Sequence, residues 1–247
     1  MSTQERSNQI HIILGLGSSG INAAKLLKAE GKNVLILENN STEKIINKSN
    51  KLKSKGINVI LLDEPLNFNH FKPWIDRICS VTVSPGIDWN HLALKELRHK
   101  NIHIQGEVEL AWERLRYLKS IGITGTNGKT TVTNMLNHVL KLNNINTDMG
   151  GNVGKALSAI ALESNKKNPQ DLNWLILELS SYQIEGSPKV SPKIGIWTTF
   201  TPDHLERHND IETYFKIKRS LLEKSSIRIY NSDDLYLSSK RKELPKG

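Results

Sequence analysis

The sequence predicts an α/β protein in which two parallel, doubly wound sheets follow one another, and three observations lead to this prediction. Short apolar runs of strand length alternate with helical stretches along the chain. A glycine-rich loop, Gly15–Gly20, follows the first predicted strand, and a second one, Gly125–Thr131, stands between a strand and a helix. The pattern restarts near Gly106, which predicts two units, 1–106 and 107–247.

The elements of the first unit follow from its apolar runs and from the residues that interrupt them. Ile21, Ala24 and Leu27 recur at helical spacing after the first glycine-rich loop, and Gly31 ends that helix. A lysine-rich helix precedes Gly56. The predicted strands are Ile10–Leu14, Val34–Leu37, Asn58–Leu62, Ile78–Val83 and Ile102–Ile104, and the other predicted helices are Ile21–Ala29 and Leu92–Lys100.

The second unit shows the same alternation without repeating the sequence of the first. The predicted helices are Glu107–Leu118, Thr130 to about Leu142 and Ile211–Leu222, and the predicted strands are Ser120–Thr124, Trp174–Glu178, Ile194–Thr199 and Ile227–Tyr230. The turn Asn231–Asp234 follows the last strand, and we predict a polar, lysine-rich tail over Leu235–Gly247.

Composition limits the class of protein. The chain has 247 residues, of which 37% are hydrophobic and 24% charged, as in ordinary globular domains. The longest apolar runs, such as Val59–Leu62, are too short to cross a bilayer, and Met1–Gln9 lacks the apolar core of a signal peptide. The lone Cys79 excludes an internal disulfide and a cysteine-based zinc site. We therefore predict a cytoplasmic protein with no membrane span.

The net charge does not identify a polyanionic partner. There are 34 Lys and Arg residues against 25 Asp and Glu, which gives +9. The densest basic stretch, Lys44–Lys55, contains no aromatic residue on which single-stranded bases could stack. We predict a solvated helix face there and no nucleic-acid partner.

The loop Gly125-Thr-Asn-Gly-Lys-Thr-Thr131 has the composition of a phosphate-binding loop. Glycines let backbone N–H groups close around phosphate oxygens, and the helix N-terminus adds partial positive charge. In such a loop Lys129 would reach the outer phosphates of a nucleotide, and the Thr130 hydroxyl would ligate Mg²⁺. The spacing is shorter than the common one, because Ile123 stands five residues before Gly128. A plain turn before a helix is the alternative.

Other candidate residues follow the ends of strands. Gly15-x-Gly-x-x-Gly20 matches a dinucleotide-binding fingerprint, with Glu38 at the end of the next strand, but such a loop can bind any diphosphate. Glu178 ends a strand where a carboxylate could hold Mg²⁺, although a capping role is an alternative. The segment Thr201–His208 follows another strand and contributes His204.

Taken together, these segments resemble the Mur ligases, ATP-dependent amide-forming enzymes of peptidoglycan synthesis. The similarity runs from about Ile10 to Asp234. It rests on the segments Gly122–Thr131, Glu178–Glu185, Asp203–His208, Ser84–Gly86 and Gly151–Gly154. The resemblance implies a Rossmann-like N-terminal domain followed by a P-loop-type central domain that is incomplete here. It also implies a part in cell-wall biogenesis, cell shape and cell division.

The resemblance also assigns roles, and it is strongest to the branch that joins D-glutamate to UDP-N-acetylmuramoyl-L-alanine through an acyl phosphate. Lys129, Glu178, His204 and Lys218 would be catalytic, with Lys218, rather than Lys216, as the family's carbamoylated lysine. The residues implied to bind ATP are Gly125, Thr126, Asn127, Gly128, Lys129, Thr130 and Thr131, and those implied to hold Mg²⁺ are Thr130, Glu178, His204 and Lys218. The residues implied to bind the UDP-sugar are Gly17, Ser18, Ser19, Glu38, Asn39, Asn40, Ser84, Pro85, Gly86, Asn152 and His204.

The sequence departs from the family pattern at two places. Glu38-Asn39-Asn40 lacks the basic residue expected beside the uracil. The chain also stops near the middle of the second of three family domains, so the D-glutamate-binding domain would be absent. The expectation is an N-terminal fragment that is inactive alone, with a complementing C-terminal chain as a candidate partner.

Three alternatives remain at this point. A degenerate fragment could bind a UDP-sugar or a nucleotide without catalysis. A nicotinamide-dependent oxidoreductase could use the first glycine-rich loop, although such an enzyme needs neither the Lys129 loop nor Glu178 and His204. A nucleic-acid-binding protein is suggested by charge alone.

Overall fold

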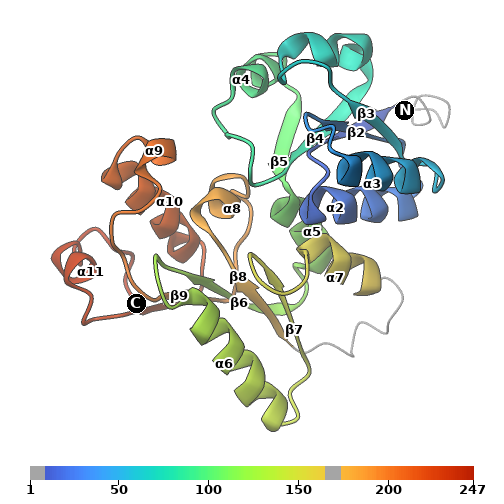
Figure 1. Cartoon of the computed structure of the whole chain (residues 1–247). Coiled ribbons are helices and arrows are strands. Elements are labelled where there is room, and N and C mark those ends of the chain that lie inside the picture. Colours follow the sequence, from blue (N-terminus) through green and yellow to red (C-terminus); the bar gives the residue numbers. More distant parts are fainter. Residues whose placement is uncertain (1–8, 165–173) are drawn as a thin grey trace.

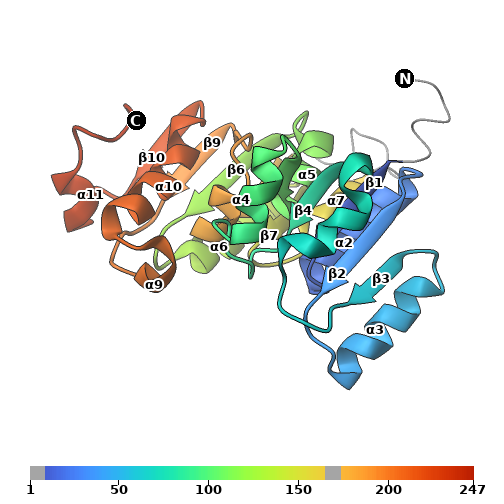
Figure 2. The same cartoon turned by 90° about the horizontal axis from the view of Figure 1, so that it is seen from above.

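A computed structural model describes residues 9–164 and 174–247. The described chain forms an α/β structure with two five-stranded sheets, each entirely parallel (Figure 1). Seen from above, the two sheets lie side by side, with helices α5 and α7 between them (Figure 2). The predicted fold class is confirmed.

The first sheet has the strand order β3-β2-β1-β4-β5. Its strands are β1 (Ile10–Leu14), β2 (Val34–Glu38), β3 (Asn58–Leu61), β4 (Ile78–Val83) and β5 (His103–Gly106). Strand β2 is buried along its whole length, as expected where helices cover both faces of a parallel sheet. The order reverses beside β1, so the crevice at the carboxyl ends of β1 and β4 is the place where open α/β sheets bind ligands.

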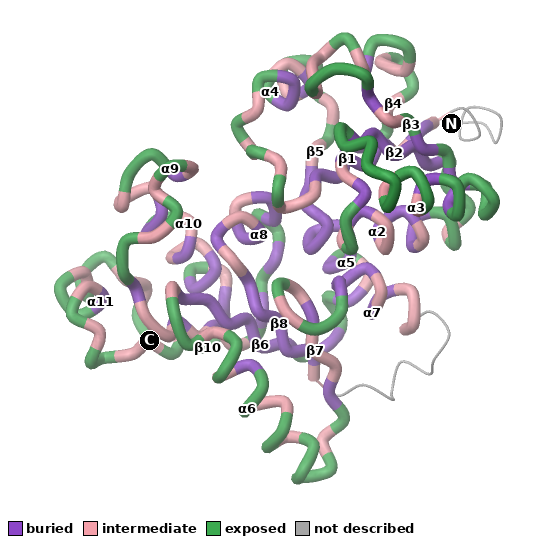
Figure 3. The backbone as a smooth tube through the Cα atoms, viewed as in Figure 1, coloured by how far each residue is buried: buried purple, intermediate pink, exposed green. Residues whose placement is uncertain are grey.

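The helices of the first sheet pack on both of its faces. They are α2 (Ser18–Ala29), α3 (Glu43–Lys53), the 3₁₀ helix Phe68–Arg77 and α4 (Leu92–His99). One apolar cluster joins α2 and α3 to the sheet, and another joins α4 and the 3₁₀ helix to its other face. The lysines of α3 lie mostly on the exposed side, as predicted (Figure 3).

The second sheet has the strand order β10-β9-β6-β8-β7. Its strands are β6 (Lys119–Thr124), β7 (Thr147–Gly151), β8 (Trp174–Glu178), β9 (Ile194–Trp197) and β10 (Ile227–Tyr230). Its helices are α5 (Glu107–Leu115), α6 (Lys129–Leu142), α7 (Leu157–Ser164), α8 (Ser181–Glu185), α9 (Leu205–His208), α10 (Ile211–Glu223) and α11 (Leu235–Ser239). Helix α6 packs on one face of this sheet, while the larger apolar cluster lies on the other face.

Helix α5 connects the two sheets and belongs to the cores on both sides. Leu110 packs into the cluster beneath the first sheet, whereas Trp112 and Leu115 belong to the large cluster of the second. Arg114 makes a forked ion pair with Glu30 at the end of α2, with both N–O distances at 2.8 Å. The two sheets are therefore joined by packed apolar and charged contacts as well as by the chain.

Most predicted elements are present with small shifts at their ends, and several were missed. Helix α2 begins at Ser18, three residues before the predicted start, and β9 ends at Trp197, before the predicted Thr199. The 3₁₀ helix, β7, α7, α8, α9 and α11 were not predicted. The predicted polar tail was wrong in part, because Leu235–Ser239 forms α11 and buries Leu237.

The described helices include none that combines the length and apolar character needed to cross a membrane.

Candidate active site

Residues that the sequence singled out come together at the carboxyl ends of the second sheet's strands. Strand β6 leads into the loop 125–128, β8 ends at Glu178, and β9 leads toward Thr198 and Thr199. Because the strands are parallel, these ends meet at one edge of the sheet, where ligands bind in α/β proteins.

The loop between β6 and α6 has a backbone shape that requires glycine. Gly125 has φ +151° and Gly128 has φ +81°, and a methyl group on Gly125 would overlap the Thr198 hydroxyl. The loop is tied to the end of β9, because the Asn127 N–H donates to Thr199 Oγ1 at 2.9 Å and the Thr198 hydroxyl donates to the Asn127 carbonyl at 2.5 Å. Helix α6 begins at once after Gly128, so its free N–H groups face the loop.

Two lysines converge on one backbone oxygen of this loop. Lys129 Nζ donates to the Gly125 carbonyl at 2.9 Å and to the Thr126 carbonyl at 2.8 Å. Lys218 Nζ, from the buried side of α10, donates to the same Gly125 carbonyl at 2.8 Å. The sequence placed these lysines about ninety positions apart, and the fold brings them to a shared acceptor.

Their surroundings lower the affinity of both amines for a proton. Burial, with Lys129 as the second cause, lowers the pKa of Lys218 to about 7. Burial also lowers the pKa of Lys129, against the opposing charges of Glu178 and Asp203. Lys216 is exposed, so of the two lysines weighed in the sequence, Lys218 is the one that reaches the site.

Glu178 is fully buried and has one carboxylate oxygen free. Its Oε1 accepts from the Asn152 side-chain amide at 2.8 Å, and Oε2 has no hydrogen-bond partner. The Asn152 N–H also donates to the Glu178 carbonyl at 2.8 Å. A buried carboxylate oxygen without a partner suits a cation, since an unpaired charge away from water is costly.

Two oxygen donors near the loop suit magnesium. The described residues contain no group of three or more His, Cys, Asp or Glu side chains placed to hold a metal. The Thr130 hydroxyl at the start of α6 and the free oxygen of Glu178 are hard oxygen donors, which Mg²⁺ prefers together with phosphate oxygens and water. Glu178 and Thr130 thus fit a nucleotide-bound Mg²⁺.

His204 lies in the segment after β9 in a left-handed backbone conformation, with φ +53°. Its ring is half-exposed, 3.5 Å from Asp203 Oδ2 and 3.7 Å from Glu206 Oε1. The ring centroid is 5.1 Å from that of Tyr182 on α8. His204 therefore lies on the same side of the sheet as Glu178 and is open to a ligand.

A separate cavity of about 470 Å³ lies at the carboxyl edge of the first sheet. Six of the eleven residues implied for the UDP-sugar line this cavity. Those that line the cavity are Gly17, Glu38, Asn39, Asn40, Ser84 and Gly86. Ser18 and Ser19 begin α2 beside it, Pro85 lines a smaller neighbouring cavity, and Asn152 and His204 lie at the second sheet.

Glu38 has a role that the motif alone did not indicate. Its carboxylate accepts from the Leu16 N–H at 2.6 Å and from the Asn40 N–H at 2.8 Å. The side chain is buried and holds the first glycine-rich loop against the end of β2. Both of its oxygens thus have backbone donors, so its first role is to shape the loop.

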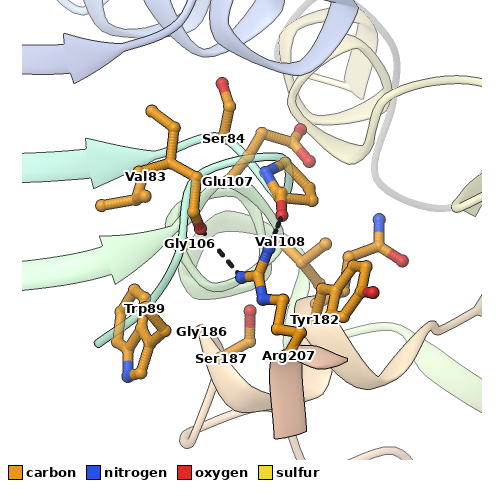
Figure 4. A pocket seen from close by; sticks show the side chains of 13 residues that line it. Val83, Ser84, Trp89, Gly106, Glu107, Val108, Tyr182, Gly186, Ser187 and Arg207 are labelled. Atoms are coloured by element: carbon orange, nitrogen blue, oxygen red, sulfur yellow. Dashed lines mark hydrogen bonds between the residues drawn. The ribbon is translucent and has the colours of Figure 1, made fainter. Parts of the chain in front are cut away.

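Arg207, which no sequence pattern indicated, connects the loops of the two sheets. Figure 4 shows its guanidinium pointing into a small cavity between the sheets, and it donates to the Pro85 carbonyl at 3.0 Å and the Ile87 carbonyl at 2.8 Å. It also lies over the Tyr182 ring, 4.1 Å from the centroid. Sequence carries no signal for these contacts, because both acceptors are backbone atoms more than a hundred residues away.

Comparison with known proteins identifies the family. The sequence profile of the Mur ligase middle domain matches residues 123–247, the half of the chain that carries the loop, Glu178, His204 and Lys218. The chain belongs to the Mur ligase family. The resemblance noted from the sequence is thereby confirmed.

Two similar relatives carry the same name. The UDP-N-acetylmuramoylalanine–D-glutamate ligase of Prochlorococcus marinus strain NATL2A is 80% identical over all 247 residues, which cover 53% of that protein. The ligase of the same name from Prochlorococcus marinus strain SARG is 51% identical, again over the whole chain and 52% of the relative. The chain spans about half the length of the curated relatives it matches.

Solved structures of Mur ligases share the fold. A UDP-N-acetylmuramate:L-alanyl-gamma-D-glutamyl-meso-diaminopimelate ligase from Neisseria meningitides matches 95% of this chain and 75% of its own, with a TM-score of 0.60 at 14% identity. A murein peptide ligase from Psychrobacter arcticus matches 96% of this chain and 52% of its own, with a TM-score of 0.55 at 17% identity. At these identities the likeness concerns the fold: a Rossmann-like unit followed by the Mur central unit.

Proposed function

We propose that this chain supplies the UDP-sugar-binding and nucleotide-binding portions of an ATP-dependent ligase that joins D-glutamate to UDP-N-acetylmuramoyl-L-alanine. The observation that carries the proposal is the meeting of Lys129, Lys218 and the free oxygen of Glu178 around one glycine-rich loop. Residues 1–106 would form the UDP-sugar domain and 107–247 the first part of the ATP-binding domain. The names of the relatives support the choice of substrates.

ATP binding requires an exchange at the loop. Lys129 now satisfies two loop carbonyls, and in the nucleotide complex its ammonium would turn to the β- and γ-phosphates. The N–H groups at the start of α6 would face the same phosphates. Mg²⁺, held by Glu178 and Thr130, would neutralise phosphate charge when bound.

The proposed first step forms an acyl phosphate. A carboxylate oxygen of the L-alanine end attacks the γ-phosphorus of ATP, and the bond to the β-phosphate oxygen breaks to release ADP. Two anions must meet in this step, so the chain's part is to place cationic groups around them. Lys129 serves the transferred phosphoryl group, and His204 and Asn152 would orient the carboxylate end of the UDP-sugar.

The proposed second step forms the amide. The amine of D-glutamate attacks the acyl carbon, phosphate leaves, and the amine gives up a proton. In the family the D-glutamate site lies in a further domain. We therefore propose that these 247 residues bind substrates but do not complete the reaction alone.

The lowered pKa of Lys218 supports the proposal that this residue is the carbamoylated lysine of the family. An amine whose pKa is lowered to about 7 is present in substantial part as the neutral form near pH 7, so its lone pair can attack CO₂ and release one proton. The product would be an anionic oxygen donor beside the loop that carries Gly125, the ligand type that suits a second Mg²⁺ together with His204. Incubation with ¹³CO₂ should give a carbamate signal in the NMR spectrum that Lys218→Arg removes.

Titration calorimetry with UDP-N-acetylmuramoyl-L-alanine tests the proposed function directly, once circular dichroism has shown a folded chain. Saturable binding, together with Mg-ATP binding at a separate site, is the expected result. Ligation assays with a separately expressed C-terminal portion would then test completion of the reaction. A folded chain that binds neither ligand contradicts the proposal, and saturable NADH fluorescence would favour an oxidoreductase instead.

A further inference from the structure

The contacts of Arg207 join three loops that follow three different strands. Its two terminal nitrogens donate to the carbonyls of Pro85 and Ile87, after β4 of the first sheet. Its guanidinium plane lies over Tyr182 on α8, which follows β8 and Glu178. Arg207 itself is three residues after His204, in the segment that follows β9. One side chain thus touches or adjoins loops that follow β4, β8 and β9.

The short helix that carries Arg207 is itself firmly held. His208, the next residue, is buried, and its Nε2 lies 2.9 Å from Ser181 Oγ. The His208 ring also stacks on Tyr214 of α10, with centroids 5.3 Å apart. These contacts fix α9 to α8 and α10. The backbone of Arg207 is therefore held in place, and its side chain can hold the loop that follows β4.

The acceptors require an arginine. Two carbonyl oxygens separated by one residue are bound by two nitrogens of one planar guanidinium, whose donors have fixed directions. A lysine ammonium is a single point and would have to choose between the two carbonyls or bind both poorly. The aromatic ring of Tyr182 supports the guanidinium face and keeps its plane in place.

We propose that Arg207 is a positioning residue that sets the spacing between the UDP-sugar loop Ser84–Ile87 and the loop that carries His204. The inference rests on the proposed function, because the spacing matters only to a ligand that spans both sheets. UDP alone would contact the first sheet, and ATP would contact the second. UDP-N-acetylmuramoyl-L-alanine would reach from the first sheet to the second. Of the three ligands, it alone therefore requires a fixed distance between the two loops.

Binding measurements on Arg207→Ala separate positioning from general damage. Titration calorimetry with UDP, Mg-ATP and UDP-N-acetylmuramoyl-L-alanine should show the first two affinities unchanged within a factor of about two and the third weakened about tenfold. Arg207→Lys keeps the charge and should not restore binding of the spanning ligand. Arg219→Ala is the matched control, since Arg219 bonds only Glu223 on its own helix among the described contacts.

Three results would overturn the inference. Unchanged affinity of Arg207→Ala for the spanning ligand would show that the spacing does not depend on this side chain. Equal losses for UDP and the spanning ligand would indicate damage to the first sheet. Full rescue by Arg207→Lys would mean that charge, and not the forked contact, is what matters.

A measurement without ligand keeps the inference separate from the proposed function. Hydrogen–deuterium exchange followed by mass spectrometry should show faster exchange in peptides covering 84–88 and 203–208 of Arg207→Ala, with α3 unchanged. Equal exchange in Arg207→Ala and Arg219→Ala would show that the Arg207 contact does not restrict the motion of these two loops. If the wild-type chain shows the constraint but binds no UDP-sugar, the proposed function fails while Arg207 still joins the loops.

Discussion

At the scale of single residues, the nucleotide loop is held in place by the lysines that are expected to serve its ligand. Lys129 and Lys218 both donate to the Gly125 carbonyl. Two like charges near one oxygen favour loss of a proton from the more buried amine, which is Lys218. An arriving phosphate would offer Lys129 a full negative charge in place of two carbonyl dipoles, so nucleotide binding is expected to be an exchange of partners.

Lys129→Ala is expected to remove Mg-ATP binding, with a loss of at least about a hundredfold in affinity, because the main cation for the outer phosphates is gone. UDP-sugar binding should persist, since that cavity belongs to the first sheet. Calorimetry with both ligands checks this. Lys141→Ala, at an exposed position of the same helix, is the control. Equal loss of both ligands in a folded Lys129→Ala chain would contradict two separate sites.

Glu107 gives a prediction about pH. It is almost fully buried, its Oε1 accepts from the Ser158 N–H at 2.6 Å, and burial raises its pKa. Above pH 4.5 the folded chain therefore keeps a proton that the unfolded chain has lost, so stability falls as pH rises through the raised pKa. Glu107→Gln imitates the protonated form and should remove this decline.

Urea unfolding between pH 4 and pH 8 would test the Glu107 prediction. The variant should gain stability relative to the wild type as pH rises from 4 to 8. Glu113→Gln, on the exposed side of the same helix, should not show the trend. A gap between Glu107→Gln and wild type that stays constant with pH would disprove the assignment.

Sequence could predict residues whose chemistry is local. The glycines and Lys129 form one contiguous motif, so the loop was found, and Glu178 was found because it ends an apolar strand. Partners across the fold could not be predicted in this way. Nothing near Glu38 in the sequence indicates that the Leu16 N–H binds it, and nothing near Arg207 indicates two carbonyls after β4.

At the scale of elements, local propensity decided which parts were predicted. Strands β1, β2 and β8 are mostly apolar runs, interrupted by His11 in β1 and ended by a glutamate in the other two, and they were found nearly to the residue. Strand β7 has the sequence Thr-Asp-Met-Gly-Gly, which has low strand propensity, and it forms because β8 pairs with it. Such an element exists through its tertiary neighbour, so sequence patterns alone do not find it.

The loop between β6 and α6 yields a prediction that compares two glycines. Gly125→Ala places a methyl group on Thr198 at a positive φ and should lower the free energy of unfolding by about 2 kcal/mol or more. Gly17→Ala makes the same change in the first glycine-rich loop, where φ is −74° and a Cβ would meet open space. It should change stability by less than about 0.5 kcal/mol. Thermal unfolding of the two variants gives the comparison, and equal effects would contradict it.

At the scale of the whole molecule, the second sheet is covered unevenly. Among the described residues, α6 is the helix that packs on one of its faces, over β6, β7 and β8. Ile227 and Ile229 of β10 lie 48% and 49% exposed, beyond the reach of that helix. An apolar face of this kind favours association between molecules.

The chain is therefore expected to self-associate as its concentration rises, and Ile229→Lys should lower that tendency severalfold by placing a charge on the strand. Sedimentation velocity over a range of concentrations measures the effect. Leu142→Lys, at the exposed end of α6, changes an equally apolar position away from the sheet. If both variants, or neither, reduce association, the face at β10 is not the surface involved.

The contact made by Arg207 has an evolutionary consequence. Both of its acceptors are main-chain oxygens, of Pro85 and Ile87, and a carbonyl is present whatever side chain a position carries. Side chains in the loop Ser84–Ile87 can therefore change without loss of the hydrogen bonds to Arg207, provided that the backbone path is kept. The side-chain requirement of this contact therefore falls on position 207, and a single codon there can preserve or abolish this one link between the two sets of loops.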